Sequence, residues 1–328
     1  MPPWILFTYS LDLDPARQAE DCARWGLEHV LLAPDQLTDP RLAEALRARG
    51  IGLVLNLPVL YAPLELRAHP EHLSRTWRDR PAVHSWLHMA CPGDERFLAA
   101  RARRFEPLLR DLAPAAVSLD FLRFYVHWEE VPLDGDPAAV EDGCYCRDCL
   151  AAFAREAGEV AHRGPDGALP PEQWPAWAAW KSRRITELCR RFAGQVRAAL
   201  PDTPLYVKTI PWGQGDLADG LRRVAGQDLE ALAPLVDAFA PMTFTHVLGL
   251  GLEWKARCLQ EVARRTGKPV LSYIQTASLD GRTLPLADLE AELADARRRG
   301  HPAVVFGWEA LTGDPARQAL VAARHHPG

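Results

Sequence analysis

The feature that most constrains the fold of this chain is a regular alternation of short apolar runs with helix-forming segments. Eight such runs occur, and each is followed by a helical pattern or by a long loop. They cover residues 4–9, 29–32, 51–57, 205–210, 236–244, 269–275 and 303–308, with a central run that begins at Ala116. Short buried strands that alternate with helices are typical of a parallel sheet with crossover connections.

Residues typical of helix starts and helix ends lie between the apolar runs. Asp14 followed by Pro15 is a typical helix start, and Gly50, Gly267 and Gly300 follow the ends of helical patterns. We therefore predict an α/β fold, a single (β/α)8 (TIM) barrel domain spanning residues 1–328. A doubly wound open sheet is the alternative, but no glycine-rich phosphate turn follows the first run, which favours the barrel.

Two segments are longer than ordinary connections between a strand and a helix. They cover about residues 62–93 after the third run and about residues 128–175 after the fourth. Long loops inside a compact domain are usually functional. We expect both insertions at the rim of the barrel, as walls of a site or as a subunit interface, so a homo-oligomer stays an open alternative.

Composition excludes several classes of protein. The 328 residues carry a net charge of −5 with acids and bases interspersed, which argues against a nucleic-acid partner or an anionic membrane surface. No apolar stretch is long enough to span a membrane, and the amino-terminal residues do not resemble a secretory signal. Seven cysteines, an odd number, argue against a secreted disulfide scaffold, so we expect a cytoplasmic protein.

The side chains at the ends of the strands predict the character of the site, because barrel enzymes bind substrates at the carboxyl ends of their strands. These side chains are mostly aromatic or polar, with few simple aliphatic groups. The candidate binding residues are Tyr9, Asp35, Asn56, Tyr61, Arg123, Tyr125, His127, Trp128, Lys208, Trp212, Phe244, His246, Tyr273, Gln275 and Trp308. Flat rings pack on sugar faces while acids and amides bind hydroxyls, so this composition indicates an oligosaccharide or glycoside substrate.

Cleavage of a glycosidic bond needs two carboxyl groups, one as proton donor and one as nucleophile or base. Asp120 is the best candidate because it lies deep on the fourth strand, and Glu309 is second. Glu129, Glu130 and Asp35 are in reserve. A structural ion pair of Asp120 with Arg123 or Lys208 is the competing interpretation. No serine lies in a nucleophile elbow, and no spacing of His, Asp and Glu is typical of a catalytic zinc site.

A cysteine cluster predicts a structural metal. Cys144, Cys146 and Cys149 form the pattern C-x-C-x2-C, and zinc prefers four tetrahedral thiolate or imidazole ligands. Cys91 in the other insertion is our choice for the fourth ligand, with His88 as the alternative. Such a site would clamp the two insertions together. Reduced cysteines without metal are the competing interpretation, and we expect no organic cofactor.

Several motifs, in this order, resemble glycoside-hydrolase-like TIM-barrel families. They lie at residues 119–124, 144–153, 180–186 and 236–244. The cysteine arrangement is also similar to the structural zinc site of family 42 β-galactosidases, which supports the four cysteine ligands. Those galactosidases carry an Asn-Glu pair after the fourth strand, and no Asn precedes Glu129 here. The resemblance therefore implies a glycosidase chemistry without a galactosidase specificity.

Two other classes of function remain open at this point. A barrel that lost its second carboxylate would be a non-catalytic glycan-binding protein. A sugar isomerase or a lyase using Lys208 would share the same fold. Sugar binding without turnover would favour the first class, and sensitivity to chelators or borohydride trapping of the lysine would favour the second.

Overall fold

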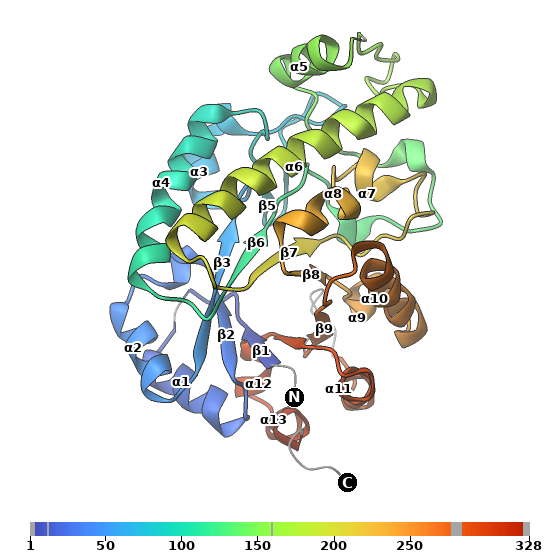
Figure 1. The fold of residues 1–328 in the computed structure, drawn as a ribbon. Helices are drawn as coiled ribbons and strands as arrows, with labels where there is room; N and C mark the ends of the chain where they lie inside the picture. The colour runs from blue at the N-terminus through green and yellow to red at the C-terminus, as the bar shows by residue number, and fades with distance from the viewer. Residues whose placement is uncertain (1–3, 12, 159, 277–283, 324–328) are drawn as a thin grey trace.

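The computed structural model describes residues 4–11, 13–158, 160–276 and 284–323. Within these residues, its centre is a sheet of eight parallel strands (Figure 1). In chain order these are β1 (Trp4–Phe7), β2 (His29–Leu32), β3 (Gly52–Pro58), β6 (Ala116–Asp120), β7 (Leu205–Thr209), β8 (Ala238–Pro241), β9 (Ser272–Gln275) and β10 (Ala303–Phe306). Each of the eight predicted runs coincides with one of them, although β3 ends at Pro58, one residue beyond its predicted run.

The sheet closes on itself. Its strand order is β8-β7-β6-β3-β2-β1-β10-β9, and every neighbouring pair is parallel. The two outer strands meet at Phe239, whose N–H donates to Pro269 O at 3.0 Å and whose carbonyl accepts from Leu271 N at 2.9 Å. The prediction of a (β/α)8 barrel is therefore confirmed. Its extent as one domain stays a prediction.

Long helices surround the barrel (Figure 1). They are α1 (Pro15–Arg24), α2 (Pro40–Ala48), α4 (Glu95–Asp111), α6 (Trp174–Ala199), α10 (Leu252–Thr266), α11 (Leu286–Arg299) and α13 (Pro315–Ala322). Asp14 caps α1, because its side chain accepts from Ala16 N at 2.9 Å and from Arg17 N at 3.1 Å. Gly267 and Gly300 end α10 and α11 with φ angles of 66° and 65°, a conformation that other residues rarely adopt.

Short elements complete the outer layer. They are α7 (Gly220–Arg223), α8 (Leu229–Leu232), α9 (Thr245–Leu248) and α12 (Trp308–Thr312). Buried side chains form two apolar clusters, one between the sheet and helices α1, α2, α11 and α13, and a larger one filling the rest. Among the described residues, no helix is both long and apolar enough to cross a membrane.

The two insertions are folded and packed against each other. The first contains α3 (Pro63–Ala68) and an antiparallel hairpin of β4 (Val83–His84) and β5 (Leu87–His88). The second contains α5 (Arg147–Ala157), which Figure 1 shows near the start of α6. Trp77 Nε1 donates to Val140 O at 2.9 Å, and Tyr145 N donates to Arg75 O at 2.8 Å. These contacts join both insertions into one rim above β3 and β6.

Candidate active site and cysteine cluster

Asp120, the last residue of β6, lies at the centre of a buried polar network. Its Oδ2 accepts from Asn56 Nδ2 at 3.0 Å and from Lys208 Nζ at 2.7 Å. Its Oδ1 accepts from the backbone N–H of Phe121 at 2.8 Å, where the chain turns with a φ of 49°. Three adjacent strands thus hold one carboxylate, and its cationic partner is Lys208, one of the two partners considered from the sequence.

The surroundings of Lys208 are apolar and aromatic. Its Nζ lies 4.4 Å from the centre of the Phe7 ring and 6.0 Å from that of Tyr273. Burial lowers the pKa of Lys208, and the charge of Asp120 opposes that shift. Burial and Asp120 together raise the pKa of Tyr273 well above its usual value. Because the Tyr273 hydroxyl has no hydrogen-bond partner among the described residues, it is free to donate to a ligand.

Arg123 lies beside this network without joining it. Its Nη1 donates to the carbonyls of Phe124 at 3.2 Å and Val126 at 2.9 Å. Its Nε and Nη2 are buried and have no hydrogen-bond partner among the described residues. A buried guanidinium with free donors is costly unless something completes it, so Arg123 is a candidate binding group for a substrate oxygen.

Glu129 is a half-buried carboxyl in the short 3₁₀ turn η3 (Trp128–Glu130). Its Oε2 is buried and has no hydrogen-bond partner among the described residues. Burial raises the pKa of Glu129 to about 7, although the nearby charge of Arg123 acts in the opposite direction. Glu129 therefore combines an unpaired oxygen with a proton that it can hold near neutral pH.

Glu309 supports the loop that follows β1. Its Oε1 accepts from Thr8 Oγ1 at 2.5 Å, Ser10 N at 2.8 Å and Tyr9 N at 3.1 Å. Its Oε2 is buried without a hydrogen-bond partner among the described residues, and a Cβ atom at position 307 would lie 2.8 Å from it. In this predicted catalytic acid, Oε1 thus accepts hydrogen bonds from two backbone N–H groups and one hydroxyl, and Oε2 is buried.

Aromatic rings line the rim beside Asp120. Tyr61 stacks on Phe121 with ring centres 4.3 Å apart and planes 18° apart. Trp86 meets both rings edge-on, at 5.9 and 6.1 Å, and lies 6.1 Å from His127. We call Tyr61, Trp86, Phe121 and His127 the aromatic wall. Trp86 is 46% exposed, so the wall has a face open to a ligand.

Trp86 and Phe121 are not among the candidate binding residues predicted from the sequence. Phe121 directly follows Asp120, and Trp86 lies between His84 and His88 in the first insertion. The position of Phe121 next to an acid at a strand end could have identified it as a candidate binding residue. Nothing in the sequence shows that the β4–β5 hairpin folds back over the end of β6.

A second aromatic group packs on the side of the barrel formed by β8 to β10. Trp128 stacks on Phe244 at 6.3 Å, and Phe244 lies 5.3 Å from Tyr273. Gln275 Oε1 accepts from the backbone N–H groups of His246 and of Val247, at 3.1 and 3.3 Å. The His246 Nε2 is buried with no hydrogen-bond partner among the described residues. These predicted binding residues lie together.

Other predicted site residues have partners elsewhere. Trp308 Nε1 donates to Asp21 Oδ2 at 3.2 Å, within the apolar cluster under α1. Asp35 forms an ion pair with Arg104 of α4, and Tyr125 O accepts from Gly143 N at 3.0 Å. Trp212 is buried and Tyr9 is 59% exposed, its ring 5.8 Å from that of Phe306. Among the described residues, Trp308 and Asp35 make no hydrogen bond or ion pair with Asp120, Asn56 or Lys208.

Four cysteines meet between the two insertions, as predicted. Cys91 Sγ lies 3.6 Å from Cys144 Sγ, 3.7 Å from Cys146 Sγ and 3.4 Å from Cys149 Sγ, and all four sulfur atoms lie within 4.8 Å of one another. Four thiolates at about 2.3 Å from one tetrahedral zinc ion are about 3.8 Å apart. The arrangement therefore fits a zinc ion.

Backbone groups complete the cysteine cluster. Gly93 N donates to Cys91 Sγ at 3.3 Å, and Cys149 N donates to Cys146 Sγ at 3.4 Å. A Cβ atom at position 93 would lie 3.3 Å from Cys149 Sγ, so the loop passes closely over the sulfur atoms. N–H donors to thiolate sulfur are the outer contacts expected of a metal site with four cysteines.

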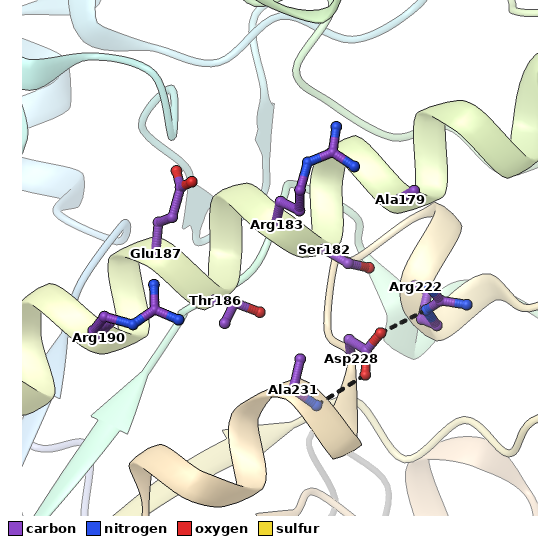
Figure 2. Close-up of a pocket in the computed structure, with 9 residues that line it drawn as sticks. All are labelled: Ala179, Ser182, Arg183, Thr186, Glu187, Arg190, Arg222, Asp228 and Ala231. Carbon is purple, nitrogen blue, oxygen red and sulfur yellow. Dashed lines mark hydrogen bonds and ion pairs between the residues drawn. The ribbon is translucent and has the colours of Figure 1, made fainter. Parts of the chain in front are cut away.

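A groove opens on the outer wall of the barrel, between α6 and the α7–α8 segment (Figure 2). Its volume is about 470 Å³, and Arg222 Nε pairs with Asp228 Oδ2 at 2.9 Å along it. Ser182 and Thr186 of α6 present hydroxyls toward this groove (Figure 2). None of the predicted site residues line it, so it is separate from the barrel mouth.

Comparison with known proteins finds likeness in structure alone. No family model matches the chain, and no curated protein matches it. Its fold is similar to the glycoside hydrolase domain of PgaB (BpsB) from Bordetella bronchiseptica, with a TM-score of 0.71 and 15% identity over 98% of both chains. It is also similar to the catalytic domain of β-amylase from Paenibacillus polymyxa, with a TM-score of 0.62 and 10% identity over 99% of both chains.

A β-galactosidase from the haloarchaeon Halorubrum lacusprofundi gives a TM-score of 0.70 at 16% identity. The match covers 98% of this chain and 57% of that one, so this chain spans just over half the length of the galactosidase. At such identities the likeness shows the fold. The chain thus has the barrel of known glycoside hydrolase domains.

Proposed function

We propose that this chain hydrolyses a glycosidic bond, with an oligosaccharide or a glycoside as substrate. One observation carries the proposal: a buried, cation-paired carboxylate at a strand end stands beside an exposed aromatic wall. Sugar rings pack on aromatic faces, and glycosidic cleavage proceeds through a positively charged transition state that a carboxylate stabilises. The similarity in fold to glycoside hydrolase domains supports this class of chemistry.

In this proposal Asp120 is the ionised carboxylate. Lys208 and Asn56 both donate to its Oδ2, which fixes the orientation of the side chain. Glu129 is the proton donor, because its Oε2 is buried and unpaired among the described residues. The free donors of Arg123 and the Tyr273 hydroxyl would bind substrate oxygens. Glu309 becomes a positioning residue for the β1 loop.

A library screen tests the proposal. Wild type, Asp120→Asn and Glu129→Gln are incubated with diverse oligosaccharides, and new reducing ends and product masses are measured. Glu141→Gln is the matched control, since Glu141 is a rim carboxylate that pairs with Arg80. We expect turnover by wild type and the control, and little by the other two variants. Full activity in Asp120→Asn would contradict the assignment.

Glycan binding without catalysis is the second candidate. The observation that favours it is the saturation of Asp120 Oδ2 and Glu309 Oε1 by protein donors, which leaves few free carboxylate oxygens. Wild type without turnover on any sugar, combined with thermal-shift responses to some of them, would establish this candidate. Cytoplasmic location and homo-oligomer formation stay predictions.

A further inference from the structure

We propose that His84, His127 and Glu130 bind a divalent zinc ion at the barrel mouth, a site distinct from the four-cysteine cluster. Two histidines and one carboxylate are a common ligand set for zinc that keeps a coordination position open. The inference goes beyond the hydrolytic function and does not depend on it, because the site is defined by its own ligand atoms.

The distances fit one ion. Glu130 Oε2 lies 3.4 Å from His127 Nδ1 and 3.6 Å from His84 Nε2. The two imidazole rings are 4.2 Å apart, and one ligand atom from each of the three residues lies within 4.8 Å of the others. Nitrogen and oxygen ligands at about 2.0–2.2 Å from a tetrahedral zinc are about 3.3–3.6 Å apart.

The three ligands have support on opposite sides. His84 lies on the β4 strand of the hairpin, whose pairing with β5 fixes the backbone. His127 and Glu130 lie at the two ends of the η3 turn, where Glu130 N donates to His127 O at 3.3 Å. The His127 Nδ1 is buried, and Glu130 is its ion-pair partner among the described residues. An ion here would link the hairpin to the loop after β6.

An open coordination position faces solvent. The His84 and Glu130 side chains are 44% and 64% exposed, so water can reach an ion held between them. Glu129 and the ring of Trp86 are neighbours of this site, the latter 6.1 Å from His127. A bound zinc would thus present a water or a substrate oxygen beside the aromatic wall. It would act as a Lewis acid or as an anchor for sugar hydroxyls.

Sequence spacing did not reveal this site, because the ligands come from separate insertions that meet only in the folded chain. The sequence contains no spacing of His, Asp and Glu that is typical of a catalytic zinc site. The structure reveals the site because it brings His84 of β4 close to His127 and Glu130 at the η3 turn.

Metal content provides the test. Purified full-length protein is loaded with excess zinc, desalted and analysed for zinc per chain, for wild type, His84→Ala, Glu130→Gln and the control His69→Ala. His69 is an exposed rim histidine that pairs with Glu71. We expect two equivalents in wild type and control and one in the other two variants. The same zinc content in wild type and in His84→Ala would overturn the proposal, whatever the cysteine cluster binds.

Cobalt separates the two sites by colour. Cobalt bound to four thiolates gives an intense sulfur-to-metal charge-transfer band, whereas a nitrogen and oxygen site gives only weak visible bands. We expect His84→Ala to lose the weak bands and keep the charge-transfer band. A loss of the charge-transfer band would show that the variant disturbs the cysteine cluster, and would contradict the assignment. Because no sugar is present, a failed hydrolysis screen does not affect this result.

Discussion

The two acids at opposite sides of the barrel mouth, Asp120 and Glu309, have similar positions and different surroundings. Asp120 is held by side chains of the neighbouring strands, with a lysine ammonium as its main partner. Glu309 is held by backbone N–H groups and a threonine hydroxyl of one loop. A carboxylate held by side chains serves the electrostatics of a site. A carboxylate that accepts hydrogen bonds from the backbone of a loop stabilises the conformation of that loop.

The Asp120→Asn variant should have the largest effect on both stability and activity. It leaves the buried Lys208 ammonium without a counter-charge, so we expect a loss of about 3–5 kcal/mol in the free energy of unfolding. We also expect at least about a 100-fold loss of any hydrolytic activity. Denaturant unfolding and product release measure the two effects.

The double variant Asp120→Asn with Lys208→Met separates the two roles. Removing both charges together should restore most of the stability, because no buried charge remains unpaired. Activity should stay absent. Recovery of activity in the double variant would show that Asp120 has a structural role alone.

Removing the metal from the cysteine cluster is expected to have the next largest effect. In a site with four thiolates, metal binding is part of the folding free energy, so Cys144→Ala should cost about 3 kcal/mol, or on the order of 10 °C in Tm. A strong chelator should lower the Tm of wild type by much more than that of the variant, because the variant keeps only the proposed site at His84, His127 and Glu130. Equal Tm values for wild type with and without chelator would rule out a structural zinc ion.

The Glu309→Gln variant should have a smaller effect. A glutamine amide oxygen can still accept the bonds from the β1 loop, and the lost charge assistance amounts to about 1–2 kcal/mol in the free energy of unfolding. We expect less than about a tenfold change in kcat, since the loop stays in place. A loss of activity as large as that of Asp120→Asn would reverse the roles that we assign to the two acids.

The smallest effect should come from Trp86→Ala in the aromatic wall. Because Trp86 is exposed, the free energy of unfolding should change by less than about 0.5 kcal/mol. Loss of an aromatic contact of about 0.5–1.5 kcal/mol would raise KM roughly 2- to 12-fold with kcat preserved. Leu64→Ala, another exposed rim residue, is the control and should leave both constants unchanged.

Much of the fold could be predicted from the sequence, because strands and helices repeat with simple periods. The eight strands, the Asp14 cap and the choice of Cys91 as the fourth cysteine all agree with the structure. The strands and the cap could be predicted from local sequence patterns. Cys91 could be predicted because zinc needs four ligands and few residues could supply the fourth. The catalytic role of Asp120 stays a prediction.

The directions of side chains and the contacts between distant segments could not be predicted from the sequence. Trp308 follows the end of a strand, yet its indole turns outward to Asp21 because it begins α12. Trp86 and His84 reach the mouth only because the hairpin folds over β6. The occupation of Glu309 by backbone N–H groups is likewise a product of the β1 loop conformation.

The network around Asp120 also has a consequence for how the barrel assembles. Its partners Asn56 and Lys208 come from the strands on either side of β6. A slip of one residue in the pairing of β6 with β7 would turn Lys208 to the opposite face of the sheet and leave the Asp120 charge buried without its partner, and a slip in the pairing of β3 with β6 would remove the Asn56 donor. The three residues at the centre of the proposed chemistry therefore also favour the native register of β3, β6 and β7 over registers shifted by one residue.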